Sequence, residues 1–170
     1  MAKRICITGT ESTGKTVLVE QLVKHFNCSL LEDVSRKYIT ELTAPYTQED
    51  VLTIARKIIE AETIMRNETN SFFISDNDLI NIKIWLMYYD WSVPDWLEEA
   101  IQRTNEDVFL LCDIDLPWQA DEQRQNPNDR AELFAQFKQA LEQLEVNYSV
   151  VNGLGGERLE RAIKIIGELS

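Results

Sequence analysis

Residues that commonly hold transition metals or form disulfides are scarce in this 170-residue sequence. It contains one histidine, His25, and three cysteines, Cys6, Cys28 and Cys112, with no C-x-x-C spacing among them. Cys6 and Cys112 fall in apolar segments, where cysteine behaves as a small hydrophobic side chain. The sequence therefore predicts neither a zinc site nor a disulfide, and it suits a reducing cytoplasm.

Long hydrophobic runs and an excess of positive charge are also lacking. No apolar stretch approaches the roughly 18 residues of a membrane span, and the chain enters a strand-like segment directly, so we expect no membrane partner and no signal peptide. Lys and Arg number 17 against 29 Asp and Glu, and the resulting net charge of −12 argues against nucleic acid as a partner. The length and a hydrophobic fraction of 44% predict a single globular domain over residues 1–170. These features do not predict the oligomeric state.

Short apolar segments alternate along the chain with longer segments of helical periodicity. This alternation predicts a three-layer α/β fold, in which a five-stranded parallel sheet carries helices on both faces. The expected strands are 4–8, 29–31, 71–75, 107–112 and 148–151. The expected helices are about 17–26, 34–42, 47–65, 77–89, 94–104 and 128–144, and a last one after the turn at 152–156.

One segment between the first strand and the first helix has a pattern with a specific chemical use. Residues 9–16 read GTESTGKT and match G-x-x-x-x-G-K-[ST]. Between a strand and a helix this pattern is typical of a P-loop, whose backbone N–H groups bind phosphate oxygens; the alternative is a glycine-rich turn before an ordinary helix. Lys15 would reach the β- and γ-phosphates of ATP, and Thr16 would bind Mg²⁺ through its hydroxyl. The other residues expected to contact the nucleotide are Gly9, Glu11, Ser12, Thr13 and Gly14.

Acidic residues follow three of the five predicted strands. Because ligands bind beyond the carboxyl ends of parallel strands, we expect these residues to surround the nucleotide. Asp76, after the third strand, is the candidate that holds Mg²⁺ together with Thr16. Asp78 would share this task or contact the substrate, and the alternative is that it caps the next helix.

Asp33 lies just after the second strand, where a kinase of this architecture would bind its acceptor. There its carboxylate would orient the acceptor hydroxyl and take up its proton. The alternatives are that Asp33 caps a helix and that Glu32 has this role. Arg36, one helical turn along, is expected either to bind substrate or to form a surface ion pair with Asp33.

A polar segment at 116–128 has no hydrophobic periodicity and predicts a lid over the phosphates. Arg124 within it and Arg130 in the next helix would bring guanidinium groups to the transferred phosphate, because arginine binds phosphate oxygens bidentately and stays charged. The alternative is a surface loop whose acidic residues pair with these arginines. Asn152, after the last strand, would lie against the ATP base.

Aromatic residues are concentrated between positions 85 and 96. A flat heterocycle could stack on them, and the alternative is that they pack helices together. They are Trp85, Tyr88, Tyr89, Trp91 and Trp96.

Several of these segments resemble one known family, the ribosylnicotinamide kinase domain of bacterial bifunctional NAD-biosynthesis and regulator proteins and its stand-alone ATPase/kinase relatives. Residues 9–16 resemble its G-x-E-S-[ST]-G-K-[ST] loop, and residues 33–38, DVSRKY, resemble its E-Y-x-R-E-[YF] segment. The strand end at 74–78, ISDND, resembles a D-T-D strand end, with Asn77 in place of Thr. Residues 111–118, LCDIDLPW, resemble the fourth strand and lid start of the stand-alone members, and 121–124, DEQR, the lid's D-G-x-R.

The resemblance implies a P-loop kinase fold and the ATP-dependent phosphorylation of the 5′-hydroxyl of nicotinamide riboside, which gives nicotinamide mononucleotide. It implies the P-loop roles of Gly14, Lys15 and Thr16. At the second strand end the family pattern changes, since Asp33 replaces Glu. We therefore expect a kinase that uses ATP and Mg²⁺ and a nucleoside-like small molecule. The alternatives are a kinase for another nucleoside or nucleotide, and a regulatory ATPase that acts as a nucleotide-gated switch.

Overall fold

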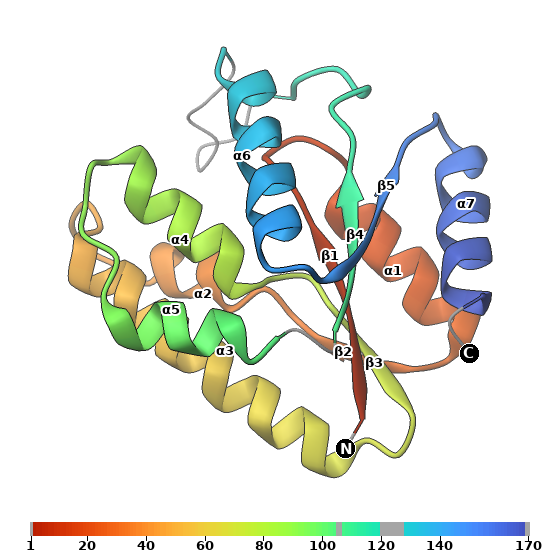
Figure 1. Cartoon of the computed structure of the whole chain (residues 1–170), viewed down its shortest axis with the longest axis horizontal. Helices are drawn as coiled ribbons and strands as arrows, with labels where there is room; N and C mark the ends of the chain where they lie inside the picture. The colour runs from red at the N-terminus through yellow and green to blue at the C-terminus, as the bar shows by residue number, and fades with distance from the viewer. Residues whose placement is uncertain (1, 105–106, 120–127, 169–170) are drawn as a thin grey trace.

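The computed structural model describes residues 2–104, 107–119 and 128–168. Five strands, all paired in parallel, form one sheet in the order β2-β3-β1-β4-β5 (Figure 1). The expected five-stranded parallel sheet is confirmed, and its central strand leads directly into the predicted P-loop. The strands are β1 Lys3–Thr8, β2 Ser29–Leu31, β3 Phe72–Ser75, β4 Val108–Cys112 and β5 Asn147–Val151.

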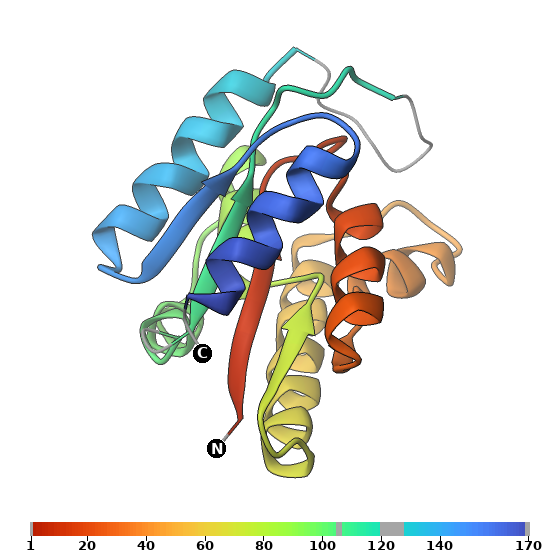
Figure 2. The same cartoon turned by 90° about the vertical axis from the view of Figure 1, so that its right-hand side faces the viewer.

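Helices cover both faces of the sheet, as the alternating pattern predicts. Figure 2 shows α1 and α7 side by side on one face, where their apolar side chains pack on β1, β3, β4 and β5. The opposite face carries α3, α4, α5 and α6, whose buried residues pack on Cys6, Phe109 and Leu111. The helices are α1 Lys15–Phe26, α2 Val34–Thr40, α3 Gln48–Glu68, α4 Leu79–Tyr88, α5 Asp95–Gln102, α6 Arg130–Gln143 and α7 Gly156–Gly167.

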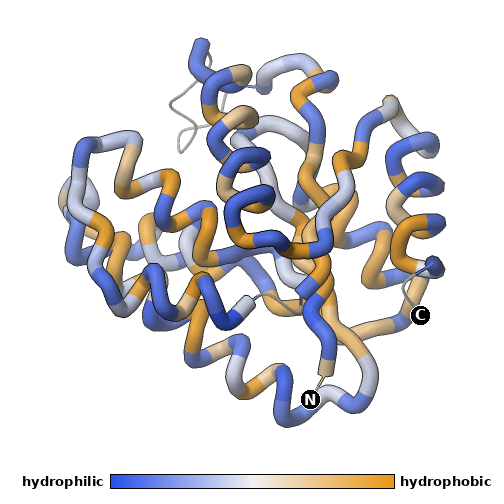
Figure 3. Tube along the Cα trace, viewed as in Figure 1, coloured by the Kyte–Doolittle hydropathy of each residue, from blue (hydrophilic) through white to orange (hydrophobic). Residues whose placement is uncertain are grey.

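The longest helix, α3, begins where the sequence predicts a cap. Thr47 and Asp50 form a reciprocal capping box, in which each side chain accepts a hydrogen bond from the other residue's backbone N–H. Along α3 hydrophobic and hydrophilic residues alternate at helical spacing (Figure 3), and Val51, Ile54 and Ile58 are buried. No helix in the described residues is both long and apolar enough to span a bilayer.

A buried cluster of charges, which the sequence does not predict, lies near the amino ends of the strands. Arg4 is fully buried, and its guanidinium donates to Asp107 at 3.0 Å and to Glu62 at 2.8 Å. Arg66 donates to the same two carboxylates. The cluster joins β1, α3 and the start of β4 at the edge of the sheet remote from the P-loop. Both carboxylates of this cluster therefore have arginine partners, which offset the cost of taking charge out of water.

Candidate functional site

The loop between β1 and α1 lines a cavity of about 690 Å³ beyond the carboxyl ends of the strands. All eight residues from 9 to 16 contribute to its wall. Gly9 has a φ of 132°, and a Cβ at this position would lie 3.0 Å from the backbone oxygen of Cys112. Gly14, with a φ of 75°, is the N-cap of α1. Both positions thus require glycine for conformational reasons, as the P-loop pattern predicts.

Lys15 holds its ammonium group against the same loop. Its Nζ donates to the backbone oxygen of Thr10 at 2.6 Å, and Thr13 Oγ1 donates to that oxygen at 2.8 Å. Burial lowers the pKa of Lys15, and nearby acidic groups, including Asp76, act in the opposite direction. The cavity wall therefore presents a cation beside a turn of backbone N–H groups, an arrangement suited to phosphate oxygens.

Thr16 and Asp76, the two residues predicted to hold Mg²⁺, lie together. Thr16 Oγ1 donates to Asp76 Oδ2 at 3.1 Å, and both residues line the cavity. Burial raises the pKa of Asp76 to about 6, with Lys15 opposing and Asp33 reinforcing this shift. In the described part of the chain no group of three or more His, Cys, Asp or Glu residues could hold a metal ion. A hydroxyl and a carboxylate fit Mg²⁺, which usually completes its octahedron with phosphate oxygens and water.

Asp33 caps a helix, which is one of the alternatives predicted for it, and it also lies on the cavity wall. It is the N-cap of α2, where its Oδ1 accepts the backbone N–H of Ser35 at 2.8 Å. It also lines the cavity, together with Arg36 one turn further along α2. Asn77, after β3, donates from Nδ2 to the same Asp33 oxygen at 2.7 Å. The carboxylate is therefore fixed by α2 and by the end of β3 while it faces the cavity.

Asp78 follows the alternative predicted for it, a helix cap, and Asn152 does not line the cavity. Asp78 is 1% exposed, and its carboxylate accepts the backbone N–H of Asn81 at 2.9 Å and the thiol of Cys6 at 3.7 Å. It thus caps α4, which is why this helix begins at Leu79 and not at 77. Neither Asp78 nor Asn152 is among the cavity-lining residues, whereas Gly153, next to Asn152, is.

The start of the predicted lid contacts the P-loop. Ser12 Oγ accepts the backbone N–H of Gln119 at 2.7 Å, and Arg130 Nη2 donates to the Ser12 backbone oxygen at 3.2 Å. The Arg130 guanidinium lies 6.0 Å from the ring centre of Trp118. Arg130 therefore lies beside the phosphate loop, where it binds the loop backbone. Arg124 and the rest of the lid at 120–127 are outside the described residues.

Arg158, on α7, belongs to the site although no sequence pattern distinguishes it from the other charged residues of that helix. Its side chain is 6% exposed and pairs with Asp115, and it also donates to the backbone oxygens of Thr13 and Gly153. Asp115 in turn accepts the Gly153 N–H at 2.6 Å. These bonds tie the P-loop to the segments that follow β4 and β5, so that three strand ends form one wall of the cavity.

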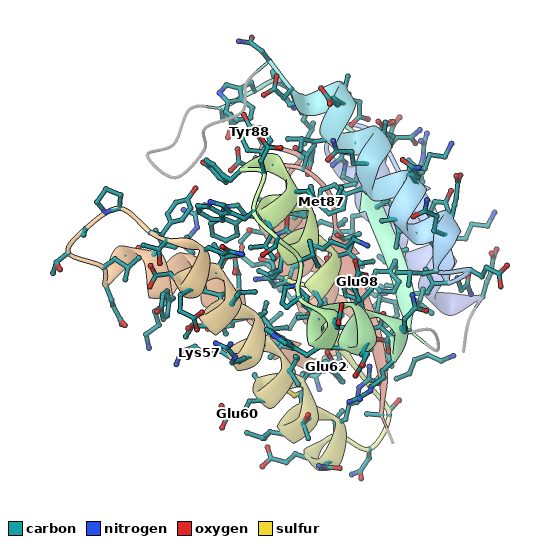
Figure 4. The ribbon with its side chains drawn as sticks, turned by 60° about the vertical axis from the view of Figure 1, so that its left-hand side comes forward. Lys57, Glu60, Glu62, Met87, Tyr88 and Glu98 are labelled. Atoms are coloured by element: carbon teal, nitrogen blue, oxygen red, sulfur yellow. The ribbon has the colours of Figure 1, made fainter. Side chains whose placement is uncertain are left out.

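Aromatic side chains form another wall of the same cavity. Tyr46, Trp85, Tyr88 and Tyr89 line it, whereas Trp91 is not among the lining residues. Tyr46 and Tyr89 share a hydrogen bond between their hydroxyls at 2.8 Å, and Trp85 Nε1 donates to Tyr46 Oη at 3.3 Å. Figure 4 shows Tyr88 at the carboxyl end of α4. The sequence did not single out Tyr46, because it lies far from the 85–96 cluster along the chain.

Comparison with solved structures gives the same fold at low sequence identity. NadR protein in complex with NR matches with a TM-score of 0.81 at 18% identity, over 98% of this chain and 50% of the NadR chain. The complex of NadR with NAD and AMP-PNP gives 0.73, also at 18% identity, over 98% and 49%. Thymidylate kinase from Ehrlichia chaffeensis gives 0.64 at 10% identity, over 99% of both chains.

The chain thus spans about half the length of the NadR chains that it matches. These matches confirm the predicted α/β P-loop kinase-like fold and agree with the family resemblance of the sequence motifs. A protein-family model described as an AAA domain matches residues 4–158, which include the P-loop, Arg158 and the five strands except Lys3, the first residue of β1. The chain therefore belongs to this AAA-domain family of P-loop proteins.

Proposed function

We propose that the protein is an ATP- and Mg²⁺-dependent kinase that phosphorylates the 5′-hydroxyl of nicotinamide riboside. The observation that carries the proposal is that one cavity joins the P-loop, the Asp33 carboxylate and the aromatic wall. Its volume of about 690 Å³ is within the usual range for a small-molecule site. A nucleotide on the loop and a nucleoside against the aromatic rings would therefore share one enclosure.

The phosphate end of the cavity supplies charge stabilisation. Backbone N–H groups of residues 9–16 and the Lys15 ammonium would bind the β- and γ-phosphates. Thr16 and Asp76 would hold Mg²⁺, which when bound neutralises phosphate charge. Arg124 and Arg130 would add guanidinium groups on the lid side. Catalysis of phosphoryl transfer depends mainly on such positioning and electrostatics.

Asp33 would act on the acceptor. Its carboxylate would orient the 5′-hydroxyl and take the proton as the oxygen bonds to the γ-phosphorus. The bond from that phosphorus to the bridging oxygen of the β-phosphate breaks, and ADP leaves. Arg36, on the same helix and the same cavity wall, would bind the sugar or the transferred phosphate.

The chemistry of the aromatic end suits a flat, uncharged or cationic ring and not a phosphate group. The lining residues contributed by the loop before α3, by α4 and by α6 include no Lys or Arg within the part of the chain that the structure describes. A phosphate group at that end would need such a cation, whereas an uncharged sugar and a cationic pyridinium ring would not. Aromatic faces attract cations as well as flat rings. The complex of the NadR fold relative with NR supports this choice of acceptor.

The test is ATP consumption by the purified protein with Mg²⁺ and a panel of acceptors. We expect rapid ADP release with nicotinamide riboside, slow release without an acceptor, and nicotinamide mononucleotide as the product by mass spectrometry. Faster turnover with another nucleoside, or with a nucleoside monophosphate, would replace the proposed acceptor. Hydrolysis that no acceptor accelerates would contradict the kinase assignment and favour a nucleotide-gated switch.

A matched pair of tryptophan variants tests the aromatic wall. Trp85→Ala is expected to raise KM for nicotinamide riboside by about 10-fold, from the loss of roughly 1–1.5 kcal/mol of ring contact, with little change in KM for ATP. Trp96→Ala is the control, because Trp96 contacts Arg56 and is not among the cavity-lining residues. Equal KM values for nicotinamide riboside in the two variants would contradict the assignment of this aromatic wall to the acceptor.

A further inference from the structure

Asn77 lies between the predicted metal-binding Asp76 and the helix-capping Asp78, and its side chain has a different set of contacts from either. It is 5% exposed and does not line the cavity. Its Oδ1 accepts the backbone N–H of Asp78 at 2.8 Å, and its backbone oxygen accepts the hydroxyl of Ser75 at 2.6 Å. Because the Asp78 N–H holds Oδ1, the amide Nδ2 of the same planar group has a fixed direction.

That direction is toward Asp33. Asn77 Nδ2 donates to Asp33 Oδ1 at 2.7 Å, although the two residues are 44 positions apart. The same oxygen accepts the backbone N–H and the hydroxyl of Ser35 at 2.8 and 2.5 Å. Among the described residues every hydrogen bond that the structure gives to Asp33 falls on Oδ1 and none on Oδ2. The carboxylate therefore has one anchored oxygen and one oxygen that accepts no hydrogen bond from these residues.

Hydrogen bonds to Oδ1, which lies off the Cβ–Cγ axis, restrain rotation of the carboxylate about that bond. Ser35 fixes the anchored oxygen from α2, and Asn77 fixes it from the end of β3, which lies beside β2 in the sheet. Donors from two different elements therefore hold this oxygen, and Asn77 supplies the one that comes from outside α2. The amide is also neutral, so it adds no further charge beside Asp33 and Asp76 while it donates.

We propose that Asn77 is a positioning residue for the phosphoryl transfer. Its amide orients the Asp33 carboxylate so that Oδ2 accepts a hydrogen bond from the acceptor hydroxyl. This inference rests on the proposed function, in which Asp33 takes the hydroxyl proton. Asn77 itself touches neither substrate. Its removal affects the rate at which bound substrates react, and not how tightly the nucleotide is held.

The variant Asn77→Asp tests this role, and it also places a second negative charge beside the Asp33 carboxylate, which adds to the expected loss. It keeps the size of the side chain and the oxygen that accepts the Asp78 N–H, but it loses the amide donor to Asp33. With nicotinamide riboside and MgATP at pH 8, we expect kcat to fall by about 10- to 100-fold, the usual effect of losing a hydrogen bond to a charged group. KM for ATP and the affinity for AMP-PNP stay within about threefold of the wild type, since residues 9–16 are unchanged.

Ser75→Ala is the matched control. It removes the hydroxyl that donates to the Asn77 backbone oxygen but leaves both anchors of Asp33 in place. We expect it to lower the thermal midpoint while kcat stays within about threefold of the wild type. A fall in kcat in Ser75→Ala as large as that in Asn77→Asp would assign Asn77 a structural role only.

A double-mutant cycle separates this inference from the proposed function. Asn77→Asp is expected to cost nothing further in an Asp33→Asn background, because residues that act through one another are not additive. Equal losses in both backgrounds, or an undiminished kcat in Asn77→Asp beside an impaired Asp33→Asn, would overturn the positioning role and leave the kinase proposal standing. An undiminished kcat in Asp33→Asn would instead refute the assigned role of Asp33.

A crystal structure of Asn77→Asp tests the geometry without an acceptor. We expect the Asp33 carboxylate to turn so that its oxygens are beyond hydrogen-bond distance of residue 77. An Asp33 carboxylate in its original orientation would overturn the inference, whichever acceptor the enzyme uses.

Discussion

Replacing Gly9 with alanine is expected to lower the free energy of unfolding by about 2–4 kcal/mol. Gly9 has a φ of 132°, and holding an L side chain in such a conformation costs about 1–3 kcal/mol. The new Cβ would also lie 3.0 Å from the oxygen and 3.4 Å from the nitrogen of the Cys112 backbone. Cys112 is fixed in β4 by its pairing with Val151, so that relief of this contact adds about 1 kcal/mol.

The measurement is urea and thermal unfolding followed by circular dichroism. For a chain of this size the expected loss corresponds to a fall of about 5–15 °C in the thermal midpoint. Gly167→Ala is the matched control, because Gly167 is the last residue of α7 and a Cβ added there would have no neighbouring atom within 4 Å. This control is expected to be neutral or stabilising by up to about 1 kcal/mol. A Gly9→Ala protein within about 0.5 kcal/mol of the wild type would refute the argument from φ and close approach.

Three further substitutions test other parts of the structure. Lys15→Ala is expected to reduce kcat by at least about 100-fold and to change the free energy of unfolding by less than about 1 kcal/mol; wild-type turnover would disprove the phosphate role. Arg4→Ala leaves a carboxylate buried with one partner fewer, so urea unfolding should show a loss of about 3–5 kcal/mol. Arg56→Ala, at an exposed ion pair, should lower the free energy of unfolding by less than about 0.5 kcal/mol. Similar losses in the two variants would contradict the special cost of burying the charges around Arg4. Thr47→Ala removes the capping box of α3 and should cost about 1 kcal/mol in the same assay, whereas an unchanged midpoint would show that the cap contributes nothing.

The elements of the fold were predictable where local sequence decides them. The strand at 29–31 has the predicted bounds, and α3 begins directly after the predicted cap at Thr47. The start of α4 was predicted at 77, two residues early, because the cap at Asp78 was only an alternative in the sequence; in the structure Asp78 accepts the Asn81 N–H and the helix begins at Leu79. The partners of Arg4 were not predictable, since Glu62 and Asp107 approach it only in the folded chain.

In the candidate site too, the residues in local motifs were predictable and those brought in by tertiary contacts were not. The P-loop is one contiguous motif, so its residues could be read directly from the sequence. Asp33 and Asp76 were predictable because ligands bind beyond the carboxyl ends of parallel strands, and both residues line the cavity. Arg158 and Tyr46 reach the cavity through the packing of α7 and of the loop before α3. Nothing in their neighbouring sequence marks them, because their position depends on tertiary contacts.

The central position of β1 has a consequence for synthesis of the chain on the ribosome. Ile5, Cys6 and Ile7 are almost fully buried, yet the neighbours of β1 are β3 and β4, which come much later in the sequence. At about 5–20 residues per second, roughly 5–20 s separate the translation of β1 from that of β4. During this interval the strand that becomes the middle of the sheet has no native pairing partner on one side. The nascent polypeptide is therefore expected to expose an aggregation-prone segment that a chaperone can shield.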